Sequence, residues 1–338
     1  MPRVAVIVPA YNAAGTLAET LASASAQSLR DIEILVVSDG STDATVDIAS
    51  RARETDPRIR VIEQANSGVA AARNTGIAAS DSAFIAPLDA DDLWHPDKLK
   101  LQLARFDACD TRTGLVYNWY RAIDAASRVL WSAARPGLEG YVLHQHLVWN
   151  FVGNGSTPLI RREALAGRGY DPELAARDAG GCEDYLLQLQ IAREWHFACV
   201  PAHLTGYRQG VGSMSGNRLT MLRSYQATYN RMRGAVGYAG RKLCDRGFAK
   251  AKVLEASHLA GRGRQRSAAA AYVAALLNAP KKTVAQTVAQ ARTLRRETAP
   301  ADAAEFGHYS DADPFAFAHT WEPNDELRRA GVFDLQAR

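Results

Sequence analysis

The sequence predicts an α/β protein, in which a Rossmann-like, mixed but mainly parallel sheet is flanked by helices and followed by a C-terminal helical segment. Two observations support this fold class. Within residues 1–92, four apolar runs of strand length alternate with three helical patterns, as expected of consecutive βαβ units. From residue 218 the chain becomes rich in Ala, Arg and Lys, which favours helices.

The four expected strands are apolar runs that end in loops, at residues 3–12, 32–38, 58–64 and 82–92. The expected helices lie between or after them, at about 16–26, 39–52, 67–80 and 96–106. The first of these places Leu17, Thr20, Leu21 and Ala24 on one face, and the second opens with Ser41, Thr42 and Asp43 as capping residues. Strands that alternate with helices in this way favour a parallel sheet covered on both faces.

The pattern beyond residue 110 is mixed. Strands are expected at 113–123 and 156–162, and one or two more at 196–208. Between them, residues 182–195 have the periodicity of an amphipathic helix. Three or four helices are expected between 218 and about 297, and the tail has no clear periodicity.

Charge is distributed unevenly along the chain, although the net charge of the 338 residues is only +4. Residues 218–300 contain 17 Lys and Arg against 3 Asp and Glu, a net charge of +14. The expected first domain, residues 1–217, and the tail, residues 301–338, each have a net charge of −5. We therefore expect three parts: an acidic first domain, a basic helical segment and an acidic C-terminal tail.

Sequence composition indicates the cellular compartment in which the protein is expected. No stretch approaches the roughly 18 apolar residues of a membrane span, and the first strand pattern begins without the features of a signal peptide. The four cysteines are scattered without C-x-x-C spacing. These observations predict a reduced, cytoplasmic chain.

The loops after the first, second and fourth strands carry polar residues, and in a parallel sheet they meet at one edge, where ligands bind. They comprise "PAYN" at 9–12, Asp39-Gly40 and the "LDADD" cluster at 88–92. In an extended segment Asp89 and Asp91 would face the same side, and oxygen ligands of this kind suit Mg²⁺ or Mn²⁺ completed by substrate phosphates. The alternative for this cluster is a polar turn that caps the next helix.

Three further side chains have both a functional and a structural interpretation. Asp39 could accept hydrogen bonds from a base or a ribose, or cap the following helix. Arg73 could hold a phosphate or the acidic cluster as a fork-shaped cation, or form a structural ion pair. Asp184, after Glu183 at a helix start, could act as a base whose pKa is lowered by the helix N-terminus; the alternative is simple capping.

Five motifs, in order, resemble those of family 2 glycosyltransferases with the GT-A fold: "VIVPAYN", "VVSDGSTDAT", "NSGVAAARNTGI", "LDADDLWHP" and "CEDYLLQL". The resemblance covers roughly residues 3–215. It implies a GT-A catalytic domain at 1–217, a nucleotide-sugar donor, a Mn²⁺ or Mg²⁺ cofactor, and inversion at the anomeric carbon.

The resemblance also implies roles for individual residues. Asp184 would be the catalytic base, with Glu183 supporting it or touching the acceptor. The metal ligands would be Asp91, Asp89 and Asp92. The nucleotide-sugar pocket would be lined by Pro9, Ala10, Tyr11, Asn12, Asp39, Gly40, Arg73, Asp89, Ala90 and Asp91. The chain departs from the family's common "DDGS" by having Ser38 in place of the first Asp, which leaves the nucleoside preference open.

The expected activity is that of a hexosyltransferase-type enzyme. It would transfer one sugar, from a UDP-sugar first of all, to a hydroxyl of a glycan or lipid-linked acceptor in cell-surface polysaccharide synthesis. The Q-x-x-R-W signature of processive synthases is absent from the sequence. The alternatives are a non-catalytic nucleotide-sugar-binding protein and a sugar-nucleotide pyrophosphorylase, whose Gly-rich loop after the first strand is lacking.

The basic segment, 218–300, suggests a further partner. Anionic lipid headgroups attract such surfaces, which would make the protein peripheral on the inner face of the cytoplasmic membrane. The alternative is a solvated helical face or one docked against the acidic parts of the chain. No nucleic-acid partner is expected.

Overall fold

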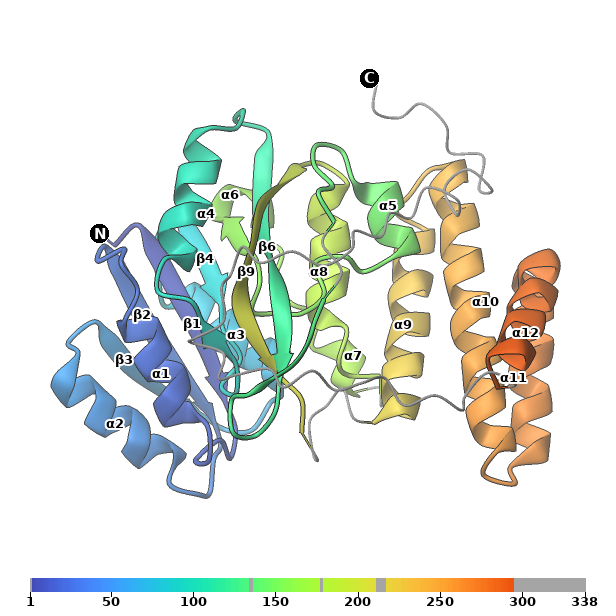
Figure 1. Cartoon of the computed structure of the whole chain (residues 1–338), viewed down its shortest axis with the longest axis horizontal. Helices are drawn as coiled ribbons and strands as arrows, with labels where there is room; N and C mark the ends of the chain where they lie inside the picture. Colours follow the sequence, from blue (N-terminus) through green and yellow to red (C-terminus); the bar gives the residue numbers. More distant parts are fainter. Residues whose placement is uncertain (1, 134–135, 177–178, 211–216, 295–338) are drawn as a thin grey trace.

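A computed structural model describes residues 2–133, 136–176, 179–210 and 217–294 of the chain (Figure 1). These residues contain a nine-stranded mixed sheet with the order β3-β2-β1-β4-β8-β6-β9-β5, and β7 pairs with β6. The strands are β1 (Val4–Ala10), β2 (Ile32–Asp39), β3 (Ile59–Gln64), β4 (Phe84–Pro87), β5 (Leu93–Trp94), β6 (Thr113–Ile123), β7 (Val129–Ser132), β8 (Leu159–Arg161) and β9 (His196–Arg208).

The first half of the sheet is parallel, because β1 pairs with β2 and β4, and β2 pairs with β3. The helices of this half are α1 (Leu17–Ser25), α2 (Thr45–Thr55), α3 (Val69–Ala78) and α4 (Lys98–Asp107). The predicted alternation of strands and helices is therefore confirmed. The fourth strand is shorter than predicted: β4 ends at Pro87, so the acidic cluster follows it in a turn.

Both faces of β1 are buried, which explains its unbroken apolar sequence. Val4, Val6 and Val8 pack with residues of α1 and α4 on one face. Ala5 and Ile7 belong to the core on the other face, which includes residues of α3 and α8. Helices on both faces leave the carboxyl ends of the strands as the accessible edge of this half of the sheet.

The second half of the sheet is mixed. β8 is antiparallel to both β4 and β6, β9 runs parallel to β6, and β5 is antiparallel to β9. The helices here are α5 (Leu143–Val148), α6 (Arg162–Leu165), α7 (Glu173–Ala176) and α8 (Glu183–Ala192). α8 is buried nearly all round, where an amphipathic helix was expected, because α5 and α9 pack against it in addition to the sheet core.

Four helices follow the sheet, as the sequence predicts: α9 (Arg218–Arg233), α10 (Tyr238–Ala260), α11 (Gln265–Asn278) and α12 (Pro280–Leu294). α9 contacts α8 and α10, and α11 and α12 pack on α10, at the end of the molecule away from β3 (Figure 1). None of the described helices has the length and apolar composition that a membrane span requires. The expected acidic tail, 301–338, lies outside the described residues, and the division into three parts stays a prediction.

Candidate active site

The loops after β1 and β2 are tied to each other. Asn12, in the left-handed region with φ of 47°, accepts a hydrogen bond from the backbone N–H of Thr42 at 2.8 Å and donates its own N–H to Oγ of Ser41 at 3.1 Å. The predicted donor-site residues Pro9 and Ala10 are the buried end of β1. Tyr11, which follows them, is 55% exposed, so its ring is accessible.

Asp39 is buried at the end of β2 and connects this strand to the start of α3. Its carboxylate accepts hydrogen bonds from the backbone N–H groups of Ser67 (2.9 Å) and Gly68 (2.8 Å), and Gly68 is the N-cap of α3. The alternative in which Asp39 caps the helix directly after it is therefore wrong. Gly40 has φ of +72°, and a Cβ there would lie 2.8 Å from the backbone nitrogen of Asn66, so this close approach requires glycine.

Arg73 and Asp89 form a largely buried ion pair between α3 and the loop after β4. Their side chains are 4% and 24% exposed, and the guanidinium lies 4.9 Å from the centre of the Tyr170 ring. Burial alone would lower the pKa of Arg73, but the Asp89 carboxylate raises it, and the net direction is upward. A Cβ at Gly155 would come within 2.9 Å of Arg73 Nη2, so the chain closes tightly over the pair.

The acidic cluster lies in a turn. The backbone N–H of Asp92 donates to the carbonyl of Asp89 at 3.0 Å, so the extended segment expected at these residues is not formed. The carbonyl of Ala90, within the turn, accepts from the hydroxyls of Thr16 and Thr20 at 2.9 and 3.0 Å. The first turn of α1 therefore fixes the position of the cluster.

Asp92 is fully buried and holds the turn in place. Its two carboxylate oxygens accept from the backbone N–H of Arg208 (2.9 Å) and from the hydroxyl of Ser156 (2.5 Å), while Nε of Arg208 donates to the carbonyl of Asp91 at 2.7 Å. Burial, with the neighbouring Asp91 and Asp89, raises the pKa of Asp92 well above its ordinary value. These partners give Asp92 a structural position behind the turn.

Asp91 is the member of the cluster whose carboxylate accepts no side-chain or backbone hydrogen bond from another described residue. Burial and the nearby Asp89 raise its pKa to about 6. Across the described residues, no group of three or more His, Cys, Asp and Glu side chains forms a ready-made metal site. Two carboxylates, Asp91 and Asp89, fit a Mg²⁺ or Mn²⁺ ion whose other ligands are water and substrate phosphates.

The start of α8 places a second pair of carboxylates opposite the Arg73–Asp89 pair. Glu183 accepts the backbone N–H of Gly181 at 2.9 Å through Oε2, while its buried Oε1 has no hydrogen-bond partner among the described residues. Burial raises the pKa of Asp184 to about 7, and the charge of Arg73 acts in the opposite direction. The expectation that the helix N-terminus lowers this pKa is therefore wrong, because burial has the larger effect.

A cavity of about 90 Å³ brings these groups together. We call it the inner cavity. Four residues that the sequence singles out line it: Arg73, Asp89, Glu183 and Asp184. The others that line it are Asn150, Gly153, Asn154, Gly155, Gly181, Cys182, Tyr207, Met221 and Tyr225. Asp39, Asn12 and Asp91 do not line it.

Most of the unforeseen lining residues come from the loop before β8 and from α9. The loop sequence "NFVGNGS", 150–156, has the Gly and Asn content of a tight turn, which could have drawn attention to it. Met221 and Tyr225 had no such pattern, because they lie in the basic segment that the sequence separates from the catalytic domain.

The sheet order, the helices on both faces and the carboxylates beyond the parallel strands define a GT-A fold of the glycosyltransferase class. Solved structures support this fold. The chain is similar to S. aureus TarS in complex with UDP-GlcNAc, with a TM-score of 0.59 and 15% identity; the match covers 94% of this chain and 100% of TarS residues 1–349. The chain is also similar to the mannosyltransferase PcManGT from Pyrobaculum calidifontis in complex with GDP-Man and Mn²⁺, with a TM-score of 0.57 and 19% identity. This match covers 88% of this chain and 81% of the other.

The sequence comparison gives the family to which the chain is similar. Residues 5–166, just under half of the chain, match the model of glycosyl transferase family 2. An uncharacterized glycosyltransferase of Nostoc sp. is 41% identical over 170 residues, or 48% of this chain and 52% of that protein. A chondroitin synthase of Pasteurella multocida is 34% identical over 106 residues, which are 31% of this chain and 11% of that protein. The chain thus spans about half or less of the length of these two relatives.

Proposed function

We propose that this protein is an inverting, metal-dependent glycosyltransferase that moves one sugar from a nucleotide-diphosphate sugar to a hydroxyl of a glycan or lipid-linked acceptor. The observation that carries the proposal is that Asp184, with a pKa of about 7, lines the same cavity as the Arg73–Asp89 pair. A general base works best when its pKa lies near the working pH.

The donor would bind along the carboxyl edge of the parallel strands. The accessible ring of Tyr11 and the loop around Asn12 would contact the nucleoside, with Pro9, Ala10 and Gly40 shaping the backbone beneath it. The Asp39 carboxylate already accepts hydrogen bonds from Gln64, Ser67 and Gly68, and it could accept one more from the donor. UDP is the first nucleotide to test, since UDP and UDP-GlcNAc are bound by TarS, which has a similar fold.

The metal would be held by Asp91 and Asp89, with Ala90 in the turn between them and Asp92 anchoring that turn from behind. When bound, a divalent cation supplies positive charge against the negative charge that develops on the departing diphosphate. Because these two side chains are the carboxylates available at this turn, the donor phosphates would complete the coordination. Arg73, neutralised by Asp89, would orient that carboxylate.

The transfer itself requires one proton to move. The Asp184 carboxylate would take the proton of the acceptor hydroxyl while that oxygen attacks the anomeric carbon on the side opposite the diphosphate. The carbon–oxygen bond to the diphosphate breaks through an oxocarbenium-like state, which inverts the configuration. Glu183, with a buried unpaired Oε1, would accept a hydrogen bond from the acceptor.

The test is a screen of nucleotide sugars with Mn²⁺, by thermal shift and then by product detection, together with two variants. Asp184→Asn should keep donor binding and lose transfer, since an amide cannot take the proton. Asp91→Ala should lose the Mn²⁺-dependent part of nucleotide affinity in calorimetry. Asp81→Asn, an exposed carboxylate before β4, is the control. Full transfer by Asp184→Asn would remove Asp184 from the base role.

A further inference from the structure

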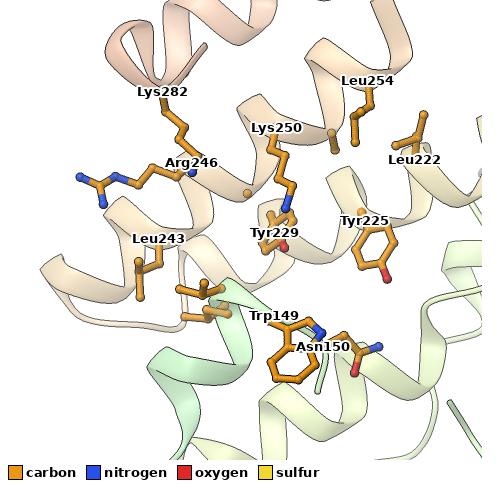
Figure 2. Close-up of a pocket in the computed structure, with 14 residues that line it drawn as sticks. Trp149, Asn150, Leu222, Tyr225, Tyr229, Leu243, Arg246, Lys250, Leu254 and Lys282 are labelled. Carbon is orange, nitrogen blue, oxygen red and sulfur yellow. The ribbon is translucent and has the colours of Figure 1, made fainter. Parts of the chain in front are cut away.

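A second cavity, of about 270 Å³, lies between the end of α5 and the C-terminal helices (Figure 2). We call it the outer cavity. Its lining is largely apolar and aromatic, from Trp149, Leu222, Tyr229, Leu243 and Leu254. A cavity here could not be predicted from the sequence, since its walls are separated by about 70 to 130 residues along the chain.

The outer cavity also carries positive charge. Arg246 and Lys250, one helical turn apart on α10, and Lys282 of α12 all line it, and Figure 2 shows them on the side of the cavity across from Trp149. Lys250 makes no hydrogen bond or ion pair within the described part of the chain. Among the described residues, no Asp or Glu lines the cavity. Three cations beside an apolar wall fit a ligand that is anionic at one point and apolar next to it.

The two cavities adjoin each other. Asn150 and Tyr225 line both the outer and the inner cavity. These two residues therefore lie between the outer cavity and the inner cavity, which Asp184 lines. The alternative, in which the basic segment is only a solvated helical face, explains neither the apolar lining nor the position of the outer cavity beside the inner cavity.

We propose that the outer cavity is the acceptor subsite, and that it takes an amphipathic acceptor bearing a phosphate group. The phosphate would lie among Arg246, Lys250 and Lys282, and the apolar part would lie against Trp149 and Tyr229. The hydroxyl-bearing end would extend past Asn150 and Tyr225 toward Asp184. This inference rests on the proposed function and adds the chemical class of its acceptor.

The experiment is a calorimetric titration of the full chain with octyl phosphate, with octyl glucoside and with inorganic phosphate. Octyl phosphate should bind more tightly than either of the others, because it alone offers both the apolar chain and the charge. Lys250→Glu and Arg246→Glu should each weaken it by about tenfold or more, as a charge-assisted hydrogen bond is replaced by repulsion. Equal affinity for octyl phosphate in wild type and in both variants would overturn the proposal.

Lys281→Glu is the matched control. This substitution changes the net charge of the protein by the same amount as Lys250→Glu, but Lys281 is an exposed residue of α12 that does not line the cavity. It should keep the wild-type affinity; a loss as large as that of Lys250→Glu would mean non-specific attraction and would also overturn the proposal. Binding of inorganic phosphate as tight as that of octyl phosphate would exclude an amphipathic ligand and identify a free-phosphate site.

A parallel titration with UDP separates this inference from the function on which it rests. UDP affinity should be the same in wild type and in Lys250→Glu. If no nucleotide or nucleotide sugar binds while octyl phosphate binding depends on Lys250, the glycosyltransferase proposal fails and the anion site stands. If donors bind and turn over but octyl phosphate does not bind, the acceptor-subsite proposal alone fails.

Discussion

The pKa of Asp184 shows how the burial of one side chain changes the pH range in which it can accept a proton. Burial raises its pKa to about 7, so the ionised fraction, and with it the rate, should rise as the pH increases through that value. At low donor and acceptor concentrations, activity should fall about tenfold per pH unit well below pH 7 and level off above it. A pH profile of kcat/KM tests this, and a flat profile across neutrality would contradict it.

The ion pair of Arg73 and Asp89 makes a second prediction at this scale. Arg73→Met leaves Asp89 partly buried without its partner, which should lower the free energy of unfolding by about 3 kcal/mol. Chemical denaturation measures this change. The control is Arg3→Met, which breaks the exposed pair of Arg3 and Asp107 and should leave stability nearly unchanged. Similar losses in the two variants would contradict the prediction.

The individual residues also show how far sequence reasoning reaches. Local patterns single out Asp89 after a strand, Asp184 at a helix start and Arg73 within a helix of small residues. The structure brings all three to one cavity. The direction of the Asp184 pKa could not be predicted in the same way. It depends on burial by residues distant in sequence, such as Tyr225, which lines the cavity from α9.

At the scale of elements, α3 lies unusually close to the sheet. A Cβ at Gly76 would come within 2.6 Å of Ile7 and 3.3 Å of Val37, on β1 and β2. Gly76→Ala should therefore destabilise the protein by about 1 to 3 kcal/mol through overpacking, although alanine favours helices. The control Gly15→Ala meets no atom within 4 Å. Thermal unfolding measures both, and a stabilised Gly76→Ala variant would contradict this prediction.

The elements predicted well are those whose pattern is local. The strands β1, β2 and β3 are continuous apolar runs or alternating segments, and their helices carry apolar residues at helical spacing. By contrast, β5 has only the residues Leu93 and Trp94, and it is a strand because it pairs with Gly206 and Thr205 of β9. A pairing across more than a hundred residues leaves no local pattern to read.

For the whole molecule, the basic helices make a prediction about surfaces. Anionic vesicles should sediment the protein at low salt and release it at high salt, because exposed lysines and arginines are attracted to lipid headgroups within a Debye length. Vesicles of neutral lipid should not sediment it. Co-sedimentation measures this, and binding that is absent or insensitive to salt would exclude electrostatic attachment through residues 218–300.

The packing of these helices on the sheet core was beyond sequence analysis. Their composition predicts helices and charge, but the contact with α8 is made by aromatic rings: Tyr225 and Tyr229 lie 5.7 and 6.3 Å from Tyr185, centre to centre. Nothing in the spacing of these tyrosines distinguishes them from surface residues.

The same tyrosine contact constrains how acceptor specificity could be exchanged between relatives. Tyr185 directly follows Asp184, so the helix that bears the proposed base is shaped to fit one particular α9. A chimera joined at residue 218 would pair the base helix of one parent with the aromatic surface of the other. A junction before Gly181 would transfer both surfaces together, and recombination experiments on such enzymes should place their crossover there.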